Sequence, residues 1–272
     1  MSENELLFSL FFVSCRSKNK VEQPMIKDFD LLQRANNDYT TIDLEHAEEL
    51  AYRELIDSIR YIPLGDECGV MGNIANIITY KGRFYIQEEQ FDRVFIYDDT
   101  GRCLKKIDNK GRGPGEYLRI ESIDINTEKE ELMLVDGMSD KLFFYDLDGN
   151  FKSIHSIRYF QTENTLCLRD SVFLHISAPS QNFGNEGLYG YALVLSKGNE
   201  NFLKGYRYLP LQVGYKGGGQ IFKGYERSCY HPIYSDTIYQ ILSDTTYGPI
   251  FYFKIKNSSW EKYHNSDRFV DI

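Results

Sequence analysis

Residues 93–108 read RVFIYDDTGRCLKKID, and residues 141–157 read KLFFYDLDGNFKSIHSI. Each stretch begins with a basic residue, runs through apolar residues into Tyr-Asp, passes a glycine and ends in a second stretch that contains lysine. The two copies begin at Arg93 and Lys141, which are 48 positions apart. A strand-rich repeat of about 40 to 50 residues is typical of the blades of a β-propeller.

Two weaker copies follow along the chain. The third strand of each unit is expected to begin near Arg93, Lys141, Tyr191 and Thr237, at spacings of 48, 50 and 46 residues. Aspartate and glycine lie between the expected strands, where tight hairpin turns need them. We therefore predict an all-β fold of four-stranded blades. Each blade packs against its neighbours, because a single sheet cannot cover both of its apolar faces.

The residues before the repeats are expected to have three roles. Residues 1–15 read as a signal-like segment, residues 16–50 as a polar tether with a short helical turn, and residues 51–272 as the propeller domain. Within the last range, Ser58–Leu64 alternates imperfectly between apolar and polar residues, which predicts a strand. We expect Ile59–Leu64 to close the ring by joining the blade at the other end of the chain.

The amino terminus resembles the signal peptide of a bacterial lipoprotein. The apolar run LLFSLFFV (residues 6–13) is followed by Ser14 and Cys15, and it is too short to span a bilayer as a helix. The resemblance implies a lipid on Cys15 and anchoring at the cell envelope. Arg16, Ser17 and Lys18 follow instead of acidic residues, which favours the periplasmic side over the surface. Glu3 and Glu5 depart from the usual basic start, so an ordinary apolar strand that ends in cysteine is the alternative.

Between the first two units, residues 110–120 read KGRGPGEYLRI. This loop, with the FFVSC, DSIRYIPL and DTIYQI stretches, resembles NHL-like six-bladed β-propellers, and more narrowly the propeller lipoproteins of Bacteroides-type bacteria. The resemblance covers Leu6 to Ile255. Six blades would need more than about 300 residues. The four recognisable units therefore predict an incomplete ring or a chain truncated at its C-terminus, with an exposed blade edge.

Composition limits the function. The 272 residues carry a formal net charge of −9, and 15% are aromatic, so a nucleic acid partner is disfavoured and strands are favoured. The five cysteines form no CxxC pair, which disfavours a zinc site, and we expect the four after Cys15 to be buried thiols. No two histidines are spaced to share a metal on a helix, and no GxSxG motif is present. We predict no catalytic residue, metal or cofactor.

The loops at the end of the propeller channel are the expected binding site. Five residues there are candidate ligand contacts: Arg112, Glu116, Tyr117, Asp136 and Asp140. Tyrosine and arginine suit glycan or peptide ligands, because they stack and form hydrogen bonds. The alternative is that Glu116 and Tyr117 only lock the loop between two blades.

These residues predict a non-enzymatic binding or scaffold propeller for a glycan, a peptide or an envelope protein. Its expected contact with the membrane is the lipid anchor at Cys15. The family resemblance leaves a metal-dependent lyase or lactonase as one alternative. A truncated product of a longer propeller gene is another.

Overall fold

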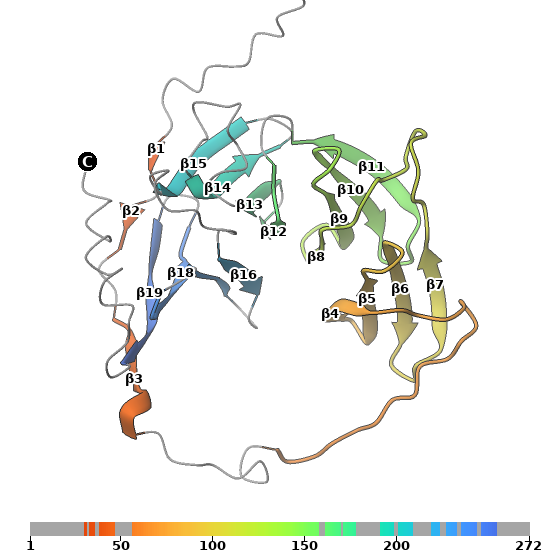
Figure 1. The fold of residues 1–272 in the computed structure, drawn as a ribbon, viewed down its shortest axis with the longest axis horizontal. Coiled ribbons are helices and arrows are strands. Elements are labelled where there is room, and N and C mark those ends of the chain that lie inside the picture. The colour runs from red at the N-terminus through yellow and green to blue at the C-terminus, as the bar shows by residue number, and fades with distance from the viewer. Residues whose placement is uncertain are drawn as a thin grey trace, which may run out of the picture.

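The computed structural model describes residues 30–31, 33–35, 38–46, 56–157, 161–169, 171–177, 191–198, 201–208, 219–223, 227–232, 235–243 and 246–254. These residues form strands β1 to β19 and the short 3-10 helix η1 (Leu44–His46). Most of the strands belong to four antiparallel sheets arranged around a common centre (Figure 1). The prediction of an all-β propeller is confirmed.

Each blade is a four-stranded sheet in chain order, with the inner strand first. Blade A contains β4 (Ile74–Tyr80), β5 (Arg83–Glu88), β6 (Arg93–Asp98) and β7 (Cys103–Ile107). Blade B contains β8 (Ser122–Asn126), β9 (Glu131–Asp136), β10 (Lys141–Asp146) and β11 (Phe151–Ser156). Blade C contains β12 (Asn164–Arg169), β13 (Val172–Ile176), β14 (Tyr191–Lys197) and β15 (Asn201–Tyr208). Blade D contains β16 (Gln220–Lys223), β17 (Ser228–His231), β18 (Thr237–Ile241) and β19 (Thr246–Lys254). The four third strands begin at the four predicted residues.

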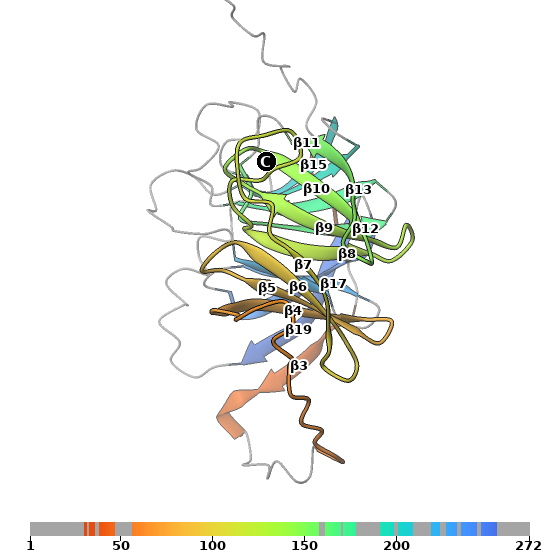
Figure 2. The ribbon, with the colours of Figure 1, turned by 90° about the vertical axis from the view of Figure 1, so that its right-hand side faces the viewer.

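Neighbouring blades hold each other by their apolar faces. Because side chains alternate along a strand, Tyr85 of β5 points to blade B while Phe84 and Ile86 point to the opposite face. Tyr85 and other residues of blade A form one buried cluster with Leu134 and Phe143 of blade B. Similar clusters join B to C and C to D. Seen from the side, the sheets of blades A and B lie face to face (Figure 2).

The blades form an open arc rather than a closed ring. The inner strands follow one another from β4 through β8 and β12 to β16. Figure 1 shows an opening between blades D and A, and residues 56–73 run along this open side. Ile74 and Ile77 of β4 are about half exposed there, at 49% and 52%. The expected exposed blade edge is therefore present in the part of the chain that is described.

The predicted closing strand at Ser58–Leu64 is wrong, because residues 56–73 contain no strand. This segment instead lies against the turn between β6 and β7, where Arg60 Nη2 donates to the carbonyl oxygen of Asp99 (2.9 Å) and Gly65 N–H donates to that of Gly101 (2.8 Å). It meets the end of a hairpin rather than the side of a strand, so it cannot continue a ladder.

Short strands from the predicted tether instead extend the sheets of blades C and D at their outer edges. β1 (Asp30–Leu31) pairs in parallel with β15, and β2 (Gln33–Arg34) and β3 (Thr40–Asp43) pair in parallel with β19. They cover the outer edges of blades C and D, which would otherwise present unpaired backbone groups. Helix η1 follows β3 directly, where a short helical turn was expected.

Two of the cysteines correct the expectation of buried thiols. Cys68 and Cys103 form a disulfide, with their Cα atoms 6.0 Å apart and the two cysteines 35 positions apart in sequence. Cys167 and Cys229 are buried thiols outside any disulfide, as expected. The bond joins the segment before the repeats to the outer strand β7, and sequence spacing alone does not reveal such a pair. Cys15 and the signal-like segment lie outside the described residues. No helix in the described ranges is long and apolar enough to cross a membrane.

Candidate functional site

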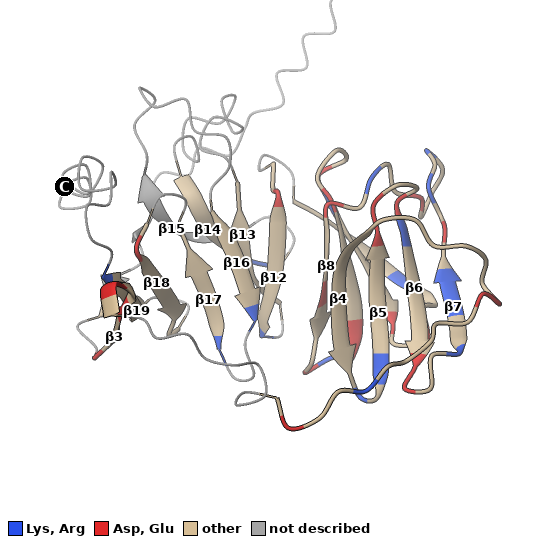
Figure 3. Cartoon of the chain, turned by 60° about the horizontal axis from the view of Figure 1, so that its bottom comes forward, with Lys and Arg blue, Asp and Glu red and all other residues tan. Residues whose placement is uncertain are grey.

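All five predicted ligand contacts lie at one end of the strands, here called the upper rim. The upper rim consists of the turn after β5 (residues 89–92), the connection from β7 to β8 (residues 108–121), and the last residue of β9 with the turn that follows it (residues 136–140). Hydrogen bonds link these three parts of the upper rim. Acidic and basic residues both lie in the loops of blades A and B (Figure 3).

Tyr117 lies beneath the upper rim and is fully buried. Its hydroxyl donates to the carbonyl oxygen of Asp92 (2.8 Å) and accepts from the N–H of Asn109 (3.1 Å). Its ring meets Phe143 of blade B edge to face, with ring centroids 6.0 Å apart. Burial raises the pKa of the Tyr117 hydroxyl. The residue therefore joins the connecting loop to blades A and B, and ligands cannot reach it in this conformation.

Glu116 folds back over its own loop. Its carboxylate accepts the N–H of Gly113 (2.6 Å) and lies so close to Gly111 that a Cβ atom there would come within 2.0 Å of Oε2. Gly115 has a φ of +82°, a conformation that side chains other than glycine rarely adopt. The glycines of GRGPGEY thus serve the loop's own shape, and the loop leads into a strand, as the sequence predicts.

The two aspartates of the turn after β9 differ in their surroundings. Asp136 is buried, and its carboxylate accepts from the N–H groups of Leu118 (2.7 Å), Met138 (3.0 Å) and Ser139 (3.1 Å). It therefore ties the connecting loop to blade B. Asp140 is partly buried, and within the described ranges its carboxylate has no hydrogen-bond partner. Burial, together with the nearby charge of Asp136, raises the pKa of Asp140.

Arg112 is the exposed tip of the connecting loop, and no ion pair or hydrogen bond engages its guanidinium among the residues described. Glu121 lies at the inner end of the same connection and forms an ion pair with Arg119 (3.3 Å). Burial raises the pKa of Glu121, and Arg119 opposes that rise. Of the five predicted contacts, Arg112 and Asp140 thus keep side-chain groups free for a ligand.

The central residue of the upper rim is Asp92, which the sequence analysis missed. Its carboxylate accepts from the N–H of Ile120 (3.1 Å) and pairs with the ammonium of Lys110. The signal was present, because Asp92 and Asp140 lie 48 residues apart. Both adopt left-handed backbone angles, with φ of 57° and 54°. An aspartate at the same position in both repeats, with the same left-handed backbone, indicates that both blades need this residue for the turn after their second strand.

The inner strands are joined by an ion pair in which the aspartate is buried and the lysine is partly exposed. Lys223 Nζ of β16 lies 2.6 Å from Asp124 Oδ2 of β8 and also donates to the carbonyl oxygen of Ile125 (3.0 Å). Asp124 Oδ2 further accepts from the N–H of Cys167 on β12 (2.7 Å). Burial raises the pKa of Asp124 although Lys223 opposes that rise. Blades B, C and D are thereby connected near the centre of the arc.

Histidines do not line the centre in the described chain. His155, His175 and His231 lie on β11, β13 and β17, none of which is an inner strand. Complete burial lowers the pKa of His175 to about 3. Its two ring nitrogens form hydrogen bonds with the hydroxyl groups of Thr165 (2.9 Å) and Ser196 (2.7 Å).

One group of potential metal ligands occurs among the described residues, formed by Asp43, Glu45 and His46. It lies at the outer edge of blade D, where Lys254 Nζ is already 3.1 Å from Asp43 Oδ2. The group is therefore remote from the inner strands.

Comparison with known proteins supports the architecture. The profile of a domain of unknown function (DUF4934) matches residues 39–270. A crystal structure of a Bacteroides fragilis protein, described as exported, superposes with a TM-score of 0.69 at 19% identity, over 84% of this chain and 65% of that one. This chain thus spans just under two thirds of that protein's length, and the low identity shows a shared fold alone.

Weaker likenesses carry no further argument. A DUF4221 family member from Bacteroides vulgatus has a TM-score of 0.43 at 11% identity, over 65% of this chain and 56% of that one. An inactive variant of virginiamycin B lyase from Staphylococcus aureus has a TM-score of 0.44 at 11% identity, over 68% of this chain and 57% of that one. No curated protein matches this sequence.

Replacing Tyr117 by phenylalanine tests the lock between the blades. The change leaves the N–H of Asn109 and the carbonyl oxygen of Asp92 without the hydroxyl, so we expect the free energy of unfolding to fall by about 1–2 kcal/mol. Urea denaturation measures this loss. The control Tyr61→Phe removes a hydroxyl from a residue that is 88% exposed and should change little. Equal effects of the two changes would contradict the assignment.

Proposed function

The chain belongs to the DUF4934 family, and we propose that it is an exported β-propeller that binds a glycan, a peptide or an envelope protein at its upper rim. In this proposal a lipid on Cys15 holds it at the cell envelope, on the periplasmic side. The protein acts as a binding or scaffold module rather than as an enzyme.

The disulfide between Cys68 and Cys103 is the observation that carries the proposed location. Structural disulfides form and persist in oxidising compartments outside the cytoplasm and are rare inside it. This bond fixes residues that precede the repeats onto blade A, so it has a structural use. The description of the Bacteroides fragilis relative as exported agrees with the same location.

The proposed anchor rests on the sequence of the amino terminus. LLFSLFFV and Ser14 precede Cys15 in the order that a lipoprotein signal requires, and Arg16, Ser17 and Lys18 follow.

Kinship with six-bladed NHL-like propellers is also part of the proposal. Four blades are described, and the chain spans 65% of the Bacteroides fragilis protein. Four blades of six would occupy a similar share, about two thirds, of a complete propeller.

The proposed binding contacts are Arg112 and Asp140, because Glu116, Tyr117 and Asp136 already have partners within the fold. A guanidinium provides several fixed N–H donors, and a carboxylate accepts from hydroxyl or ammonium groups. Glycan hydroxyls and peptide termini or side chains match this pair of groups. The upper rim lies at the end of the inner strands, where propellers commonly bind their ligands.

Cell fractionation combined with mass spectrometry tests the location. In a Bacteroides host, we expect the mature protein to begin with an acylated Cys15 and to sediment with membranes. The Cys15→Ser variant should lose the lipid and leave the membrane fraction. In both proteins Cys68 and Cys103 should resist thiol alkylation until they are reduced. An unmodified Cys15 on a chain that keeps Met1 rules out the anchor, and free thiols at Cys68 and Cys103 rule out export.

A glycan and peptide array tests the upper rim. For any array member that binds, Arg112→Ala and Asp140→Asn should each weaken binding by about tenfold, or about 1.4 kcal/mol. The matched controls, Arg102→Ala and Asp99→Asn, change the turn between β6 and β7 at the other end of blade A and should leave affinity unchanged. If the controls weaken binding as much as the rim variants do, the ligand does not bind at the upper rim.

A further inference from the structure

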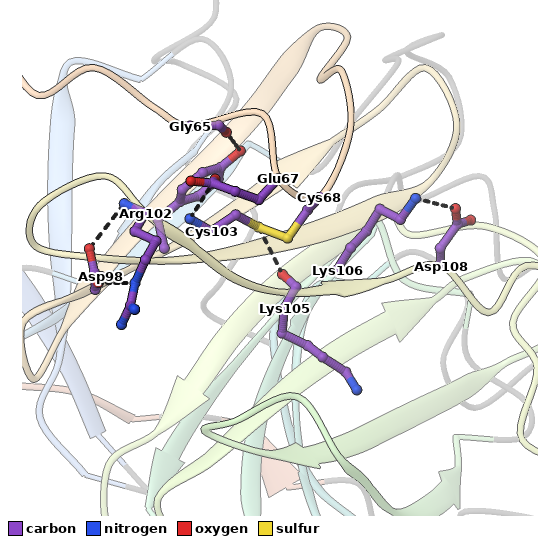
Figure 4. Close-up of a disulfide and its surroundings, with 10 residues drawn as sticks. Gly65, Glu67, Cys68, Asp98, Arg102, Cys103, Lys105, Lys106 and Asp108 are labelled. Carbon is purple, nitrogen blue, oxygen red and sulfur yellow. Dashed lines mark hydrogen bonds and ion pairs between the residues drawn. A yellow bond between two sulfur atoms is a disulfide. The ribbon is translucent and has the colours of Figure 1, made fainter.

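Residues 60–72, here called the strap, lie across the outer side of blade A and are fastened to it near one end. Tyr97 donates its hydroxyl hydrogen to the carbonyl oxygen of Gly65 (3.3 Å), and the N–H of Cys103 donates to Glu67 Oε2 (3.3 Å). The disulfide joins Cys68 to Cys103 beside these contacts (Figure 4). The strap also approaches the turn between β6 and β7 closely: a Cβ atom on Gly101 of this turn would lie 2.1 Å from the carbonyl oxygen of Pro63.

The strap covers an apolar face of blade A. Cys68 and Met71 pack against Ile86, Phe95 and Tyr97, which are at most 2% exposed. Phe84 borders the same cluster and is partly buried. The outer side of the strap faces solvent, since Tyr61 and Val70 are 88% and 85% exposed. A single layer of chain thus keeps the part of this face formed by β5 and β6 from water, while Ile77 of β4 stays half exposed.

The covered face is equivalent to the face that each later blade packs on its neighbour. Moving 48 residues along the repeat converts the covered residues of blade A into residues of blade B: Phe84 into Leu132, Ile86 into Leu134, Phe95 into Phe143 and Tyr97 into Tyr145. All four residues of blade B lie in the buried cluster between blades A and B. The strap therefore occupies the place that a neighbouring blade would take.

We propose that the Cys68–Cys103 disulfide is a redox latch on a concealed blade-docking surface, and that a second copy of this chain docks there, through the same face, once the strap is released. A dithiol performs the release by thiol–disulfide exchange. One of its thiolates attacks a sulfur of the latch, and its second thiol displaces the resulting mixed disulfide. Two electrons and two protons pass to Cys68 and Cys103, and the dithiol becomes a disulfide.

The latch is accessible to such a reagent. Both of its cysteines are partly exposed, whereas the thiols of Cys167 and Cys229 are buried. Once the bond is broken, a few hydrogen bonds and the packing of Met71 hold the strap, and each such hydrogen bond contributes little net stability in contact with water.

The size of the uncovered face favours a weak dimer. Aromatic side chains each bury roughly 150–250 Å². Part of each side chain is already covered by its own blade, so Phe84, Phe95, Tyr97 and the smaller Ile86 would together bury at most about 600 Å² per copy, or about 1,200 Å² in all, which is the lower limit for specific interfaces. Two identical faces can meet about a twofold axis, which closes the assembly at two copies.

The test compares oxidised and dithiothreitol-reduced protein in the Cys15→Ser background, which removes the amino-terminal cysteine. Trypsin cleavage at Arg60, within the strap, should accelerate by about tenfold on reduction, because local opening limits cleavage. Sedimentation velocity should show a monomer when oxidised and a concentration-dependent dimer when reduced. Unchanged cleavage at Arg60 would overturn the latch, and faster cleavage with a monomer at every concentration would overturn the docking surface.

Two variants separate the latch from the docking surface. The double variant Cys68→Ser, Cys103→Ser should show the fast cleavage at Arg60 and the dimer of the reduced protein. Dithiothreitol should change neither. Adding Phe84→Lys should keep the fast cleavage but abolish the dimer, because a charge then lies in the docking face. Circular dichroism confirms that each variant is folded. A dimer that survives Phe84→Lys would place the interface elsewhere and refute the proposal.

Discussion

The constraint behind this structure is that each blade has two apolar faces and can expose neither. Blades A, B and C each use one face on the next blade, through buried clusters such as the one that joins Tyr85 to Phe143. At roughly 25 cal/mol per Å² of buried apolar surface, these interfaces are the main source of stability. Blade A has no preceding blade in the described chain, and the strap covers the part of the remaining face that β5 and β6 form.

The same packing determines what the upper rim can do. The connection from β7 to β8 must cross from the outside of one blade to the inside of the next, and Tyr117 and Asp136 fix its path from within. Most of its polar groups are therefore used by the fold. Arg112 and Asp140 lie outside that network, so they are the better candidates for ligand contacts. A binding site on such a rim can change at exposed positions without disturbing the blades.

The repeated strands could be predicted from the sequence because their pattern is local. Contacts between residues far apart in the chain could not be predicted. The positions of β6, β10, β14 and β18 follow from a pattern of apolar residues and turn residues within each unit. The closing strand was misplaced, because alternation in Ser58–Leu64 cannot show that the segment meets a hairpin end. The Cys68–Cys103 bond and the pairing of β3 with β19 join residues far apart in the chain, which no local pattern encodes. The five candidate ligand residues do lie at one end of the blades, four in loops and Asp136 at the end of β9, but the sequence could not distinguish those with internal partners.

The most direct measurement compares Phe95→Ala with Phe143→Ala in the oxidised protein. The two phenylalanines occupy equivalent repeat positions and are both fully buried, one under the strap and one under a blade. If the strap truly replaces a blade, both changes should lower the free energy of unfolding by about 3–5 kcal/mol. A loss for Phe95→Ala of less than about 1 kcal/mol, beside a full loss for Phe143→Ala, would show that the face is not covered and would contradict the account.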